Sequence, residues 1–161
     1  MPRQTPPPSS ITVRHAEPAD APAIAALYAQ LVSNPAVSVR PERIAQLARE
    51  ESGALFVGEI GQRAVGTVLV CLCDDVMFND QPFAVVENIV VDAACRSAGV
   101  GRALLAAVEA YCLARQCSKI MLLSSAEREH AHRFFERAGF AGSLKRGFVK
   151  YRRSFAGPGL A

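Results

Sequence analysis

The feature that most constrains the fold is the stretch from Val85 to Leu105, in which a β-rich apolar run passes through a glycine-containing turn into a helical pattern. The run VVENIVVD is typical of a strand, and the turn after it reads Arg96-Ser97-Ala98-Gly99-Val100-Gly101. Beyond Gly101, apolar residues recur at three- and four-residue spacing, which indicates an amphipathic helix; they are Leu104, Leu105, Val108, Tyr111 and Cys112. The segment therefore predicts a strand, a small-residue loop and a helix whose N-terminus faces that loop.

The loop has the composition of an anion-binding turn. Ser97, Ala98 and Gly99 are small, so the chain can curl with its amide N–H groups accessible to an incoming oxyanion. The positive end of the helix dipole faces the same place, and Arg96 and Arg102 add formal charge beside it. This arrangement suits a diphosphate. The alternative interpretation is a glycine-containing connection from strand to helix that binds nothing.

Two better-known phosphate motifs fit this loop less well. A Walker loop requires a Lys-Ser/Thr pair after its last glycine, whereas Gly101 is followed by Arg102 and Ala103. A dinucleotide-binding fingerprint requires glycine or alanine where this chain has Leu104, and it usually opens its domain. The sequence disfavours both.

Composition indicates one domain, because 161 residues that are 50% hydrophobic can bury one sizeable core. The net charge of +3 and the lack of a long Lys/Arg block give no support to a nucleic-acid partner. Basic residues near the C-terminus alternate with apolar ones, as on the solvated face of a strand; they are Lys145, Arg146, Lys150, Arg152 and Arg153. The five cysteines are odd in number and lack metal-ligand spacing, which favours reduced thiols and no metal site.

The ends of the sequence predict no targeting or membrane segment. The first ten residues, MPRQTPPPSS, indicate a flexible proline-rich tail without the apolar core of a signal peptide, and residues 156–161 are expected to form a C-terminal tail. No window approaches eighteen uncharged apolar residues, so no membrane partner is expected. These features predict a cytoplasmic protein.

Periodicity and turn residues predict the order of the elements between the tails. The expected strands are 11–15, 54–60, 63–73, 83–91 and 119–125, followed by a closing pair within 140–155. The expected helices run from Ala19-Asp20 to about Val32 and over 41–51, 101–115 and 127–138. Antiparallel strands first and β-α-β-α crossovers later predict a mixed sheet with helices on both faces.

Segments in three successive parts of the chain together resemble the Gcn5-related N-acetyltransferase (GNAT) superfamily. Arg96-Ser97-Ala98-Gly99-Val100-Gly101 matches every defined position of that family's Gln/Arg-x-x-Gly-x-Gly/Ala signature. ITVRHAEPADAPAIAALY is similar to its first strand and helix, and AHRFFERAGF to its fourth helix. GFVKYRR resembles its last strand, so the resemblance covers about residues 11–155, expected as a single N-acetyltransferase domain.

The resemblance implies an α/β fold of the α+β type, with a splayed, mostly antiparallel sheet of about 6–7 strands and about four helices. It implies acetyl-CoA as the co-substrate, with the pyrophosphate on the amides of residues 97–102 and the pantetheine arm along the strand. The residues implied to bind it are Ile89, Val90, Val91, Arg96, Ser97, Ala98, Gly99, Val100, Gly101, Arg102, Arg128, His130 and Phe134. Relatives often place an asparagine where this chain has Arg128. Arg128 or His130 either serves similarly or is solvated.

The proposed reaction needs a base. An amine with a pKa of about 10.4 is almost wholly protonated at neutral pH, so a group must accept its proton. Glu87, in an otherwise apolar strand, matches a family glutamate that often acts as base, and partial burial there would raise its pKa. The alternative is a solvated or arginine-paired carboxylate. Asn88 is expected on the opposite face of the strand.

Phe135 departs from the family pattern, because many relatives have tyrosine there as the acid that protonates the leaving thiolate. Tyr151 or Tyr111 can substitute, although Tyr111 lies on the apolar face of its helix, and a thiolate can also leave into water unaided. The resemblance therefore implies acetyl transfer to a small-molecule or peptide amine by direct attack. The missing tyrosine keeps open a second function, an acyl-CoA-binding sensor or interaction module. The sequence does not give the oligomeric state, although relatives often form homodimers.

Overall fold

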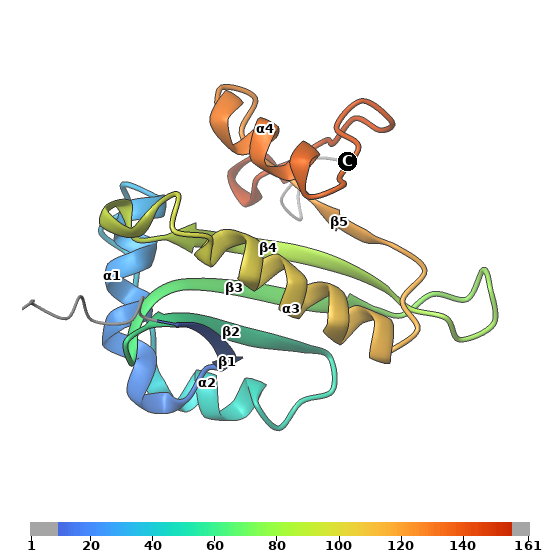
Figure 1. Cartoon of the computed structure of the whole chain (residues 1–161). Coiled ribbons are helices and arrows are strands. Elements are labelled where there is room, and N and C mark those ends of the chain that lie inside the picture. The colour runs from blue at the N-terminus through green and yellow to red at the C-terminus, as the bar shows by residue number, and fades with distance from the viewer. Residues whose placement is uncertain (1–9, 156–161) are drawn as a thin grey trace, which may run out of the picture. The chain divides into compact units, whose positions relative to one another are not determined.

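The computed structural model describes residues 10–155, which divide into two compact units between Leu122 and Leu123. In the first unit, five strands form one sheet in the order β1-β2-β3-β4-β5 (Figure 1). The strands are β1 (Ile11–His15), β2 (Gly53–Ile60), β3 (Arg63–Cys73), β4 (Phe83–Val91) and β5 (Ile120–Leu122). Neighbouring strands are antiparallel except β4 and β5, which are parallel.

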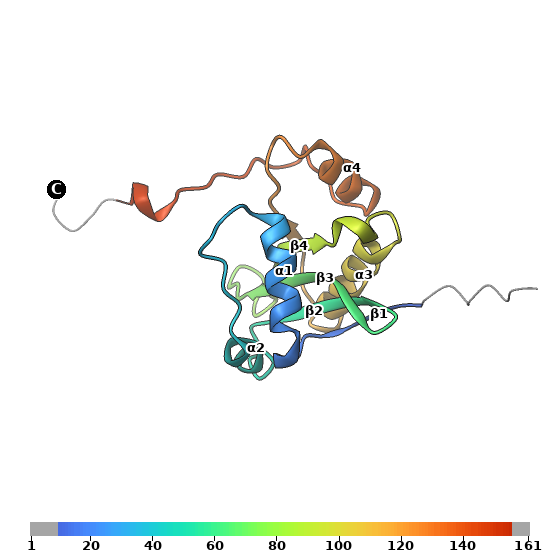
Figure 2. The same cartoon turned by 90° about the vertical axis from the view of Figure 1, so that its left-hand side faces the viewer.

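Three helices complete the first unit. They are α1 (Ala21–Leu31), α2 (Pro41–Leu47) and α3 (Val100–Ala114). Short 3-10 helices precede α1 and α3, at Pro18–Asp20 and Ala93–Cys95. The connection from α1 to α2 can be followed in Figure 2. Proline at the first position of α2 fits the sequence prediction, but α2 ends at Leu47 and is shorter than expected.

Alternate residues of the strands contribute to two separate hydrophobic cores. On one face, Phe56 of β2 packs with α3 residues such as Leu104 and Val108. On the other face, Val57 packs with Ile24 of α1 and Ile44 of α2. Because successive strand residues point to opposite faces, α3 covers one side of the sheet while α1 and α2 cover the other. The expected helices on both faces are confirmed in this unit.

Two facing glycines let α3 approach the sheet closely. Gly58 of β2 is directly opposite Gly66 of β3. A Cβ atom added at either position would lie 2.9 Å from Cγ1 of Val100, which is the first residue of α3. The absence of both side chains therefore makes room for the N-terminal turn of α3 against the sheet.

The strand β4 contains a bulge next to the proposed base. Thr67 is opposite Val90 and Leu69 is opposite Glu87, so two residues of β4 face the single residue Val68 of β3. One of those two, Asn88, has a φ of 53°. The bulge breaks the regular alternation of side chains between the two faces.

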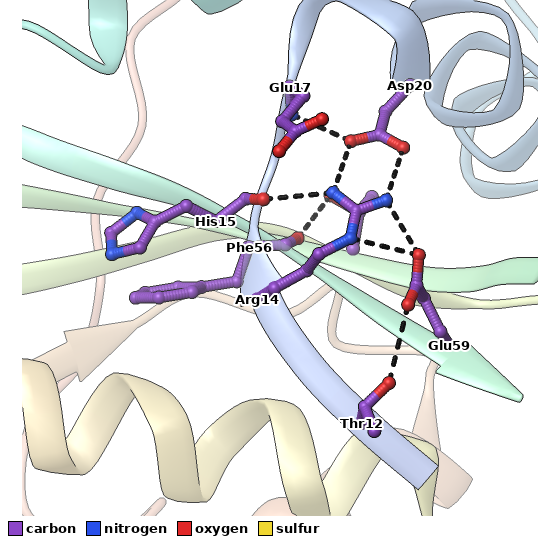
Figure 3. A network of polar contacts seen from close by, with 8 residues as sticks. Thr12, Arg14, His15, Glu17, Asp20, Phe56 and Glu59 are labelled. Carbon is purple, nitrogen blue, oxygen red and sulfur yellow. Dashed lines mark hydrogen bonds and ion pairs between the residues drawn. The ribbon is translucent and has the colours of Figure 1, made fainter. Parts of the chain in front are cut away.

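A charged network holds the first strand to the start of α1 (Figure 3). Arg14 donates to both carboxylate oxygens of Asp20, at 2.8 and 2.9 Å, and to Oε1 of Glu59 on β2 at 2.6 Å. Asp20 also accepts a hydrogen bond of 2.7 Å from the backbone N–H of Glu17, completing a capping box. The hydrogen bonds from Arg14 hold the pKa of Asp20 below its ordinary value, against the opposing effect of burial.

The second unit contains α4 (Glu129–Arg137) and a short 3-10 helix, Arg152–Ser154. Phe135 is 8% exposed and packs beside Phe134 and Phe140. The closing strand pair expected within 140–155 is wrong, because these residues form no strand and those from 141 onward are exposed. The described residues therefore hold five strands rather than the expected 6–7. The two expected tails, 1–10 and 156–161, lie outside the described residues except for residue 10.

Candidate active site

The turn between β4 and α3 is shaped by its own backbone. The side chain of Asp92 accepts from the backbone N–H of Ala94 at 3.0 Å and starts a 3-10 turn. Ser97 and Gly99 then adopt left-handed conformations, with φ of 69° and 96°. An added Cβ at Gly99 would meet only Cδ1 of Ile11, at 3.5 Å, so glycine is favoured there by conformation rather than by space.

This turn leaves a set of amide donors free at the start of α3. The helix begins its hydrogen bonding with Ala103 N–H donating to the carbonyl of Gly99 at 3.0 Å. The backbone N–H groups of residues 100–102 have no partner among residues 10–155. They point along the axis of a 15-residue helix, whose dipole places partial positive charge at this end. We call residues 96–102 the cradle.

Formal charge surrounds the cradle. Arg96 and Arg102 are exposed, and within the described part of the chain neither forms an ion pair. Two contacts hold the turn before the cradle: Arg63 pairs with Asp92 at 3.3 Å, and Gln30 of α1 accepts from the backbone N–H of Ala93 at 3.0 Å. The free amides and the two arginines suit a diphosphate such as that of coenzyme A.

The adjoining strand has an open edge. Pairing between β4 and β5 covers only Ala84–Val86 of β4, whereas β4 continues to Val91. Beyond Val86, the edge of β4 that faces away from β3 is therefore unpaired by any strand of the described chain. Ile89, Val90 and Val91, the residues expected along the pantetheine arm, lie on this edge. An extended amide-bearing chain can pair with such an edge in the manner of an added strand.

Glu87 lies on β4 just before the bulge, on the face covered elsewhere by α1 and α2. The partial burial expected for Glu87 is wrong, because its side chain is exposed. The expected orientation of Asn88 is also wrong, because the bulge brings its side chain to Tyr28 of α1, on the same side of the sheet as Glu87. Burial raises the pKa of Tyr28, and the hydrogen bond with Asn88 partly opposes that rise.

The expected site residues are divided between the two units. Glu87, residues 89–91 and the cradle belong to the first unit. The remaining four belong to the second unit and are described by themselves; they are Arg128, His130, Phe134 and Tyr151.

In the second unit, Arg128 is the exposed N-cap of α4 and His130 Nδ1 is 3.3 Å from Arg133 Nη2. Phe134 is half-buried, and Tyr151 is 61% exposed with the Arg153 guanidinium 5.0 Å from its ring centroid.

Tyr111 of α3, in the first unit, is 8% exposed, in agreement with its expected place in the core.

Sequence reasoning missed three residues that shape this region: Gly58, Gly66 and Tyr28. The two glycines stand eight positions apart in a predicted hairpin, but counting from the Gly61-Gln62 turn would have placed Gly58 opposite Val65. A register shift between Gly58 and Glu59 brings Gly58 opposite Gly66 instead. The contact of Tyr28 with Asn88 depends on the bulge, for which the sequence carries no clear signal.

Two further findings concern the residues that the structure describes. None of their helices has the length and apolar character needed to cross a membrane. They also contain no group of three or more His, Cys, Asp or Glu side chains placed to hold a metal ion.

Comparison with known proteins gives a consistent result. A model of the Acetyltransferase (GNAT) family matches residues 22–140. No curated protein matches the sequence.

Solved structures share the fold. A protein of Agrobacterium tumefaciens strain C58, assigned as an acetyltransferase, has a TM-score of 0.79 and 26% identity, covering 88% of this chain and 99% of its own. Glucosamine-6-phosphate N-acetyltransferase from Arabidopsis thaliana has a TM-score of 0.75 and 20% identity, covering 89% of this chain and 99% of its own. The aminoglycoside N-acetyltransferase AAC(6')-Iy, in complex with CoA, has a TM-score of 0.77 and 19% identity, covering 92% of this chain and 99% of its own. Since the family model spans most of the sequence, this chain belongs to the acetyltransferase (GNAT) family.

Proposed function

We propose that this protein is an acetyl-CoA-dependent N-acetyltransferase that transfers an acetyl group to a primary amine by direct attack. The cradle is the observation that carries the proposal. Its unpaired amides at residues 100–102, together with Arg96 and Arg102, form a site for a diphosphate at the end of an open strand edge. The ligand would supply an activated acetyl thioester beside that strand.

Glu87 is the proposed general base. An amine can attack only as the free base, and deprotonating an amine of pKa about 10.4 at neutral pH is equivalent to about 4–5 kcal/mol. Glu87 is exposed on the strand that carries the open edge, so its carboxylate can take a proton from an amine directly or through one water. A backbone N–H on the open edge beyond Val86 is the proposed donor to the developing oxyanion.

The first experiment titrates acetyl-CoA into the purified protein and measures the thermal midpoint of the protein at each concentration. A ligand at a hundred times its dissociation constant adds about 2.7 kcal/mol to stability, which shifts the midpoint by several degrees. Adenosine is the control, because it lacks the pyrophosphate. No shift with acetyl-CoA at millimolar concentration would mean that the cradle is only a structural turn.

The assignment of Glu87 is tested by Glu87→Gln. We expect this variant to lose turnover with any acceptor amine while binding acetyl-CoA as the parent protein does. The matched control is Glu109→Gln, at an exposed position of α3. Parental turnover in Glu87→Gln would exclude this residue as the base.

Phe135 favours a second candidate function, an acyl-CoA-binding sensor or interaction module. Phe135 is buried in α4 and has no hydroxyl group to protonate a leaving thiolate. Under the enzymatic proposal, Tyr151 is the candidate acid, or the thiolate leaves unaided. We expect Phe135→Tyr to raise turnover if protonation limits the rate, and Tyr151→Phe to lower it if Tyr151 is the acid. Acetyl-CoA binding without turnover of any amine would favour the sensor.

A further inference from the structure

Five apolar side chains beside Glu87 belong to neither hydrophobic core. They are Leu69, Cys71, Cys73, Phe83 and Val85, and we call them the apolar shelf. Each is half-buried. None of them packs in the α3-side core or in the α1- and α2-side core of the described chain. The shelf is therefore an apolar surface that the protein's own helices leave partly open.

The register of β3 and β4 places the shelf in a continuous row. Leu69 is directly opposite Glu87, Cys71 is opposite Val85, and Cys73 is opposite Phe83. Since alternate residues of paired strands share a face, all six side chains lie on the same face of the sheet. From Glu87 to Phe83 the row extends about 13 Å, at about 3.3 Å for each strand residue. The shelf thus begins at the proposed base and leads away from it.

The two ends of the shelf differ in charge. Glu87 supplies a carboxylate at one end. At the other end, Nζ of Lys119 lies 4.7 Å from the ring centroid of Phe83. A molecule with one ammonium group would be attracted to the Glu87 end and repelled from the Phe83 end. A molecule with several ammonium groups along its length would meet Lys119 unfavourably.

The side chains of the shelf itself offer little to a polyhydroxylated molecule. They present alkyl and aryl groups and two thiols, which are weak hydrogen-bonding groups. Burial raises the pKa of the Cys71 thiol, and the nearby Glu87 acts in the same direction, so this thiol stays neutral at physiological pH. The positive charge of Arg43 on α2 lowers the pKa of Cys71. Arg43 is itself paired with Glu50 at 3.1 Å. A sugar bound along the shelf would leave many hydroxyl groups without partners.

We propose that the acceptor is a primary monoamine with an extended apolar substituent, which lies along the apolar shelf and directs its amino group to Glu87. This inference rests on the proposed acetyltransferase function and adds the class of acceptor. It favours alkyl- and arylalkylamines over amino sugars and polycationic aminoglycosides.

The test compares two acceptors of equal length, n-hexylamine and 2-(2-aminoethoxy)ethanol, by thiol release from acetyl-CoA. The second compound has oxygen in place of two carbon groups. We expect kcat/KM to be about tenfold or more higher for hexylamine, because its apolar chain gains from partial burial. In Val85→Thr, a change of nearly equal shape, that advantage should fall several-fold. Val76→Thr, at a 93% exposed loop position, should keep it.

A binding measurement keeps the inference testable even without turnover. Hexylamine is titrated into the CoA-loaded protein, and the methyl NMR signals of Leu69 and Val85 are followed with Val76 as reference. We expect saturable shifts at the first two residues for hexylamine and none for the ether alcohol. Equal responses to both amines, or none at the shelf, would overturn the inference. Shifts at the shelf without turnover would instead contradict the proposed enzymatic function.

Discussion

The close approach of α3 to the sheet predicts a specific effect of Gly66→Ala. The added methyl group would lie 2.9 Å from Cγ1 of Val100, 3.1 Å from Cδ1 of Leu104 and 3.2 Å from the carbonyl oxygen of Val90. Val100 and Leu104 are 1% and 0% exposed, so neither side chain has free space to move into. The substitution must therefore push the N-terminal turn of α3 away from the sheet or strain β3.

The magnitude follows from two opposing terms. Inserting a methyl group into a well-packed core costs about 1–3 kcal/mol. Replacing glycine lowers the conformational entropy of the unfolded chain, which returns about 0.4–1 kcal/mol. The expected net loss is about 1–2 kcal/mol, and for a chain of this length the thermal midpoint should fall by about 3–6 °C.

Two readouts check this prediction: the free energy of unfolding in denaturant and the dissociation constant for acetyl-CoA. We expect both stability and binding to weaken, because Val100 starts the helix whose amides form the cradle. Gly142→Ala is the control, since its added Cβ would have its nearest neighbour, Oε1 of Glu136, at 3.8 Å. In the background Val100→Ala, which removes the Cγ1 atom, the cost of Gly66→Ala should become smaller. Parental stability and binding in Gly66→Ala would refute the argument.

Three further predictions concern the charged network and the cradle. Asp20→Asn should lower stability by about 1–3 kcal/mol, because Arg14 loses one of its two carboxylate partners and keeps only Glu59. Since Arg14 lowers the pKa of Asp20 in the folded protein, that contribution is full above the unfolded-state pKa of about 4 and is lost as the pH falls through the lower folded-state value. The difference in stability between the parent protein and Asp20→Asn should therefore become smaller below about pH 4, as measured by denaturation at several pH values. Gly99→Ala should cost about 1–2 kcal/mol through its left-handed backbone alone, and a parental thermal midpoint would contradict this. Arg96→Gln and Arg102→Gln should each weaken acetyl-CoA binding about tenfold or more at low salt, and less at high salt, without changing the thermal midpoint of the free protein.

The sequence was sufficient to predict the elements whose pattern is decided locally. The strands β1, β3 and β4 have the expected bounds, because turn residues delimit runs of β-branched and apolar residues. The helix α3 begins one residue before its expected start, at Val100. For these elements, propensity, periodicity and turn chemistry all indicate the same structure.

The predicted closing strands show where that reasoning fails. The segment GFVKYRR alternates apolar and basic residues, yet Phe148 is 87% exposed and Val149 is 62% exposed. Alternation specifies a strand only when another strand supplies the hydrogen bonds and a core covers the apolar side. Within the described residues this segment has neither. An alternating pattern is thus necessary for a half-buried strand, but it does not suffice to predict one.

The candidate site divides in the same way between local and non-local causes. The small residues and arginines of the cradle could be recognised because an anion-binding turn is built from consecutive residues. The position of the cradle depends on Gly58 and Gly66, which lie far from it in sequence and act only by being opposite each other under Val100. Likewise, counting alternate residues along β4 placed Asn88 on the wrong face, because one extra residue in the strand reverses the alternation. A bulge in the strand that bears the proposed base therefore brings Asn88 to the side of the sheet where Glu87 and the apolar shelf lie.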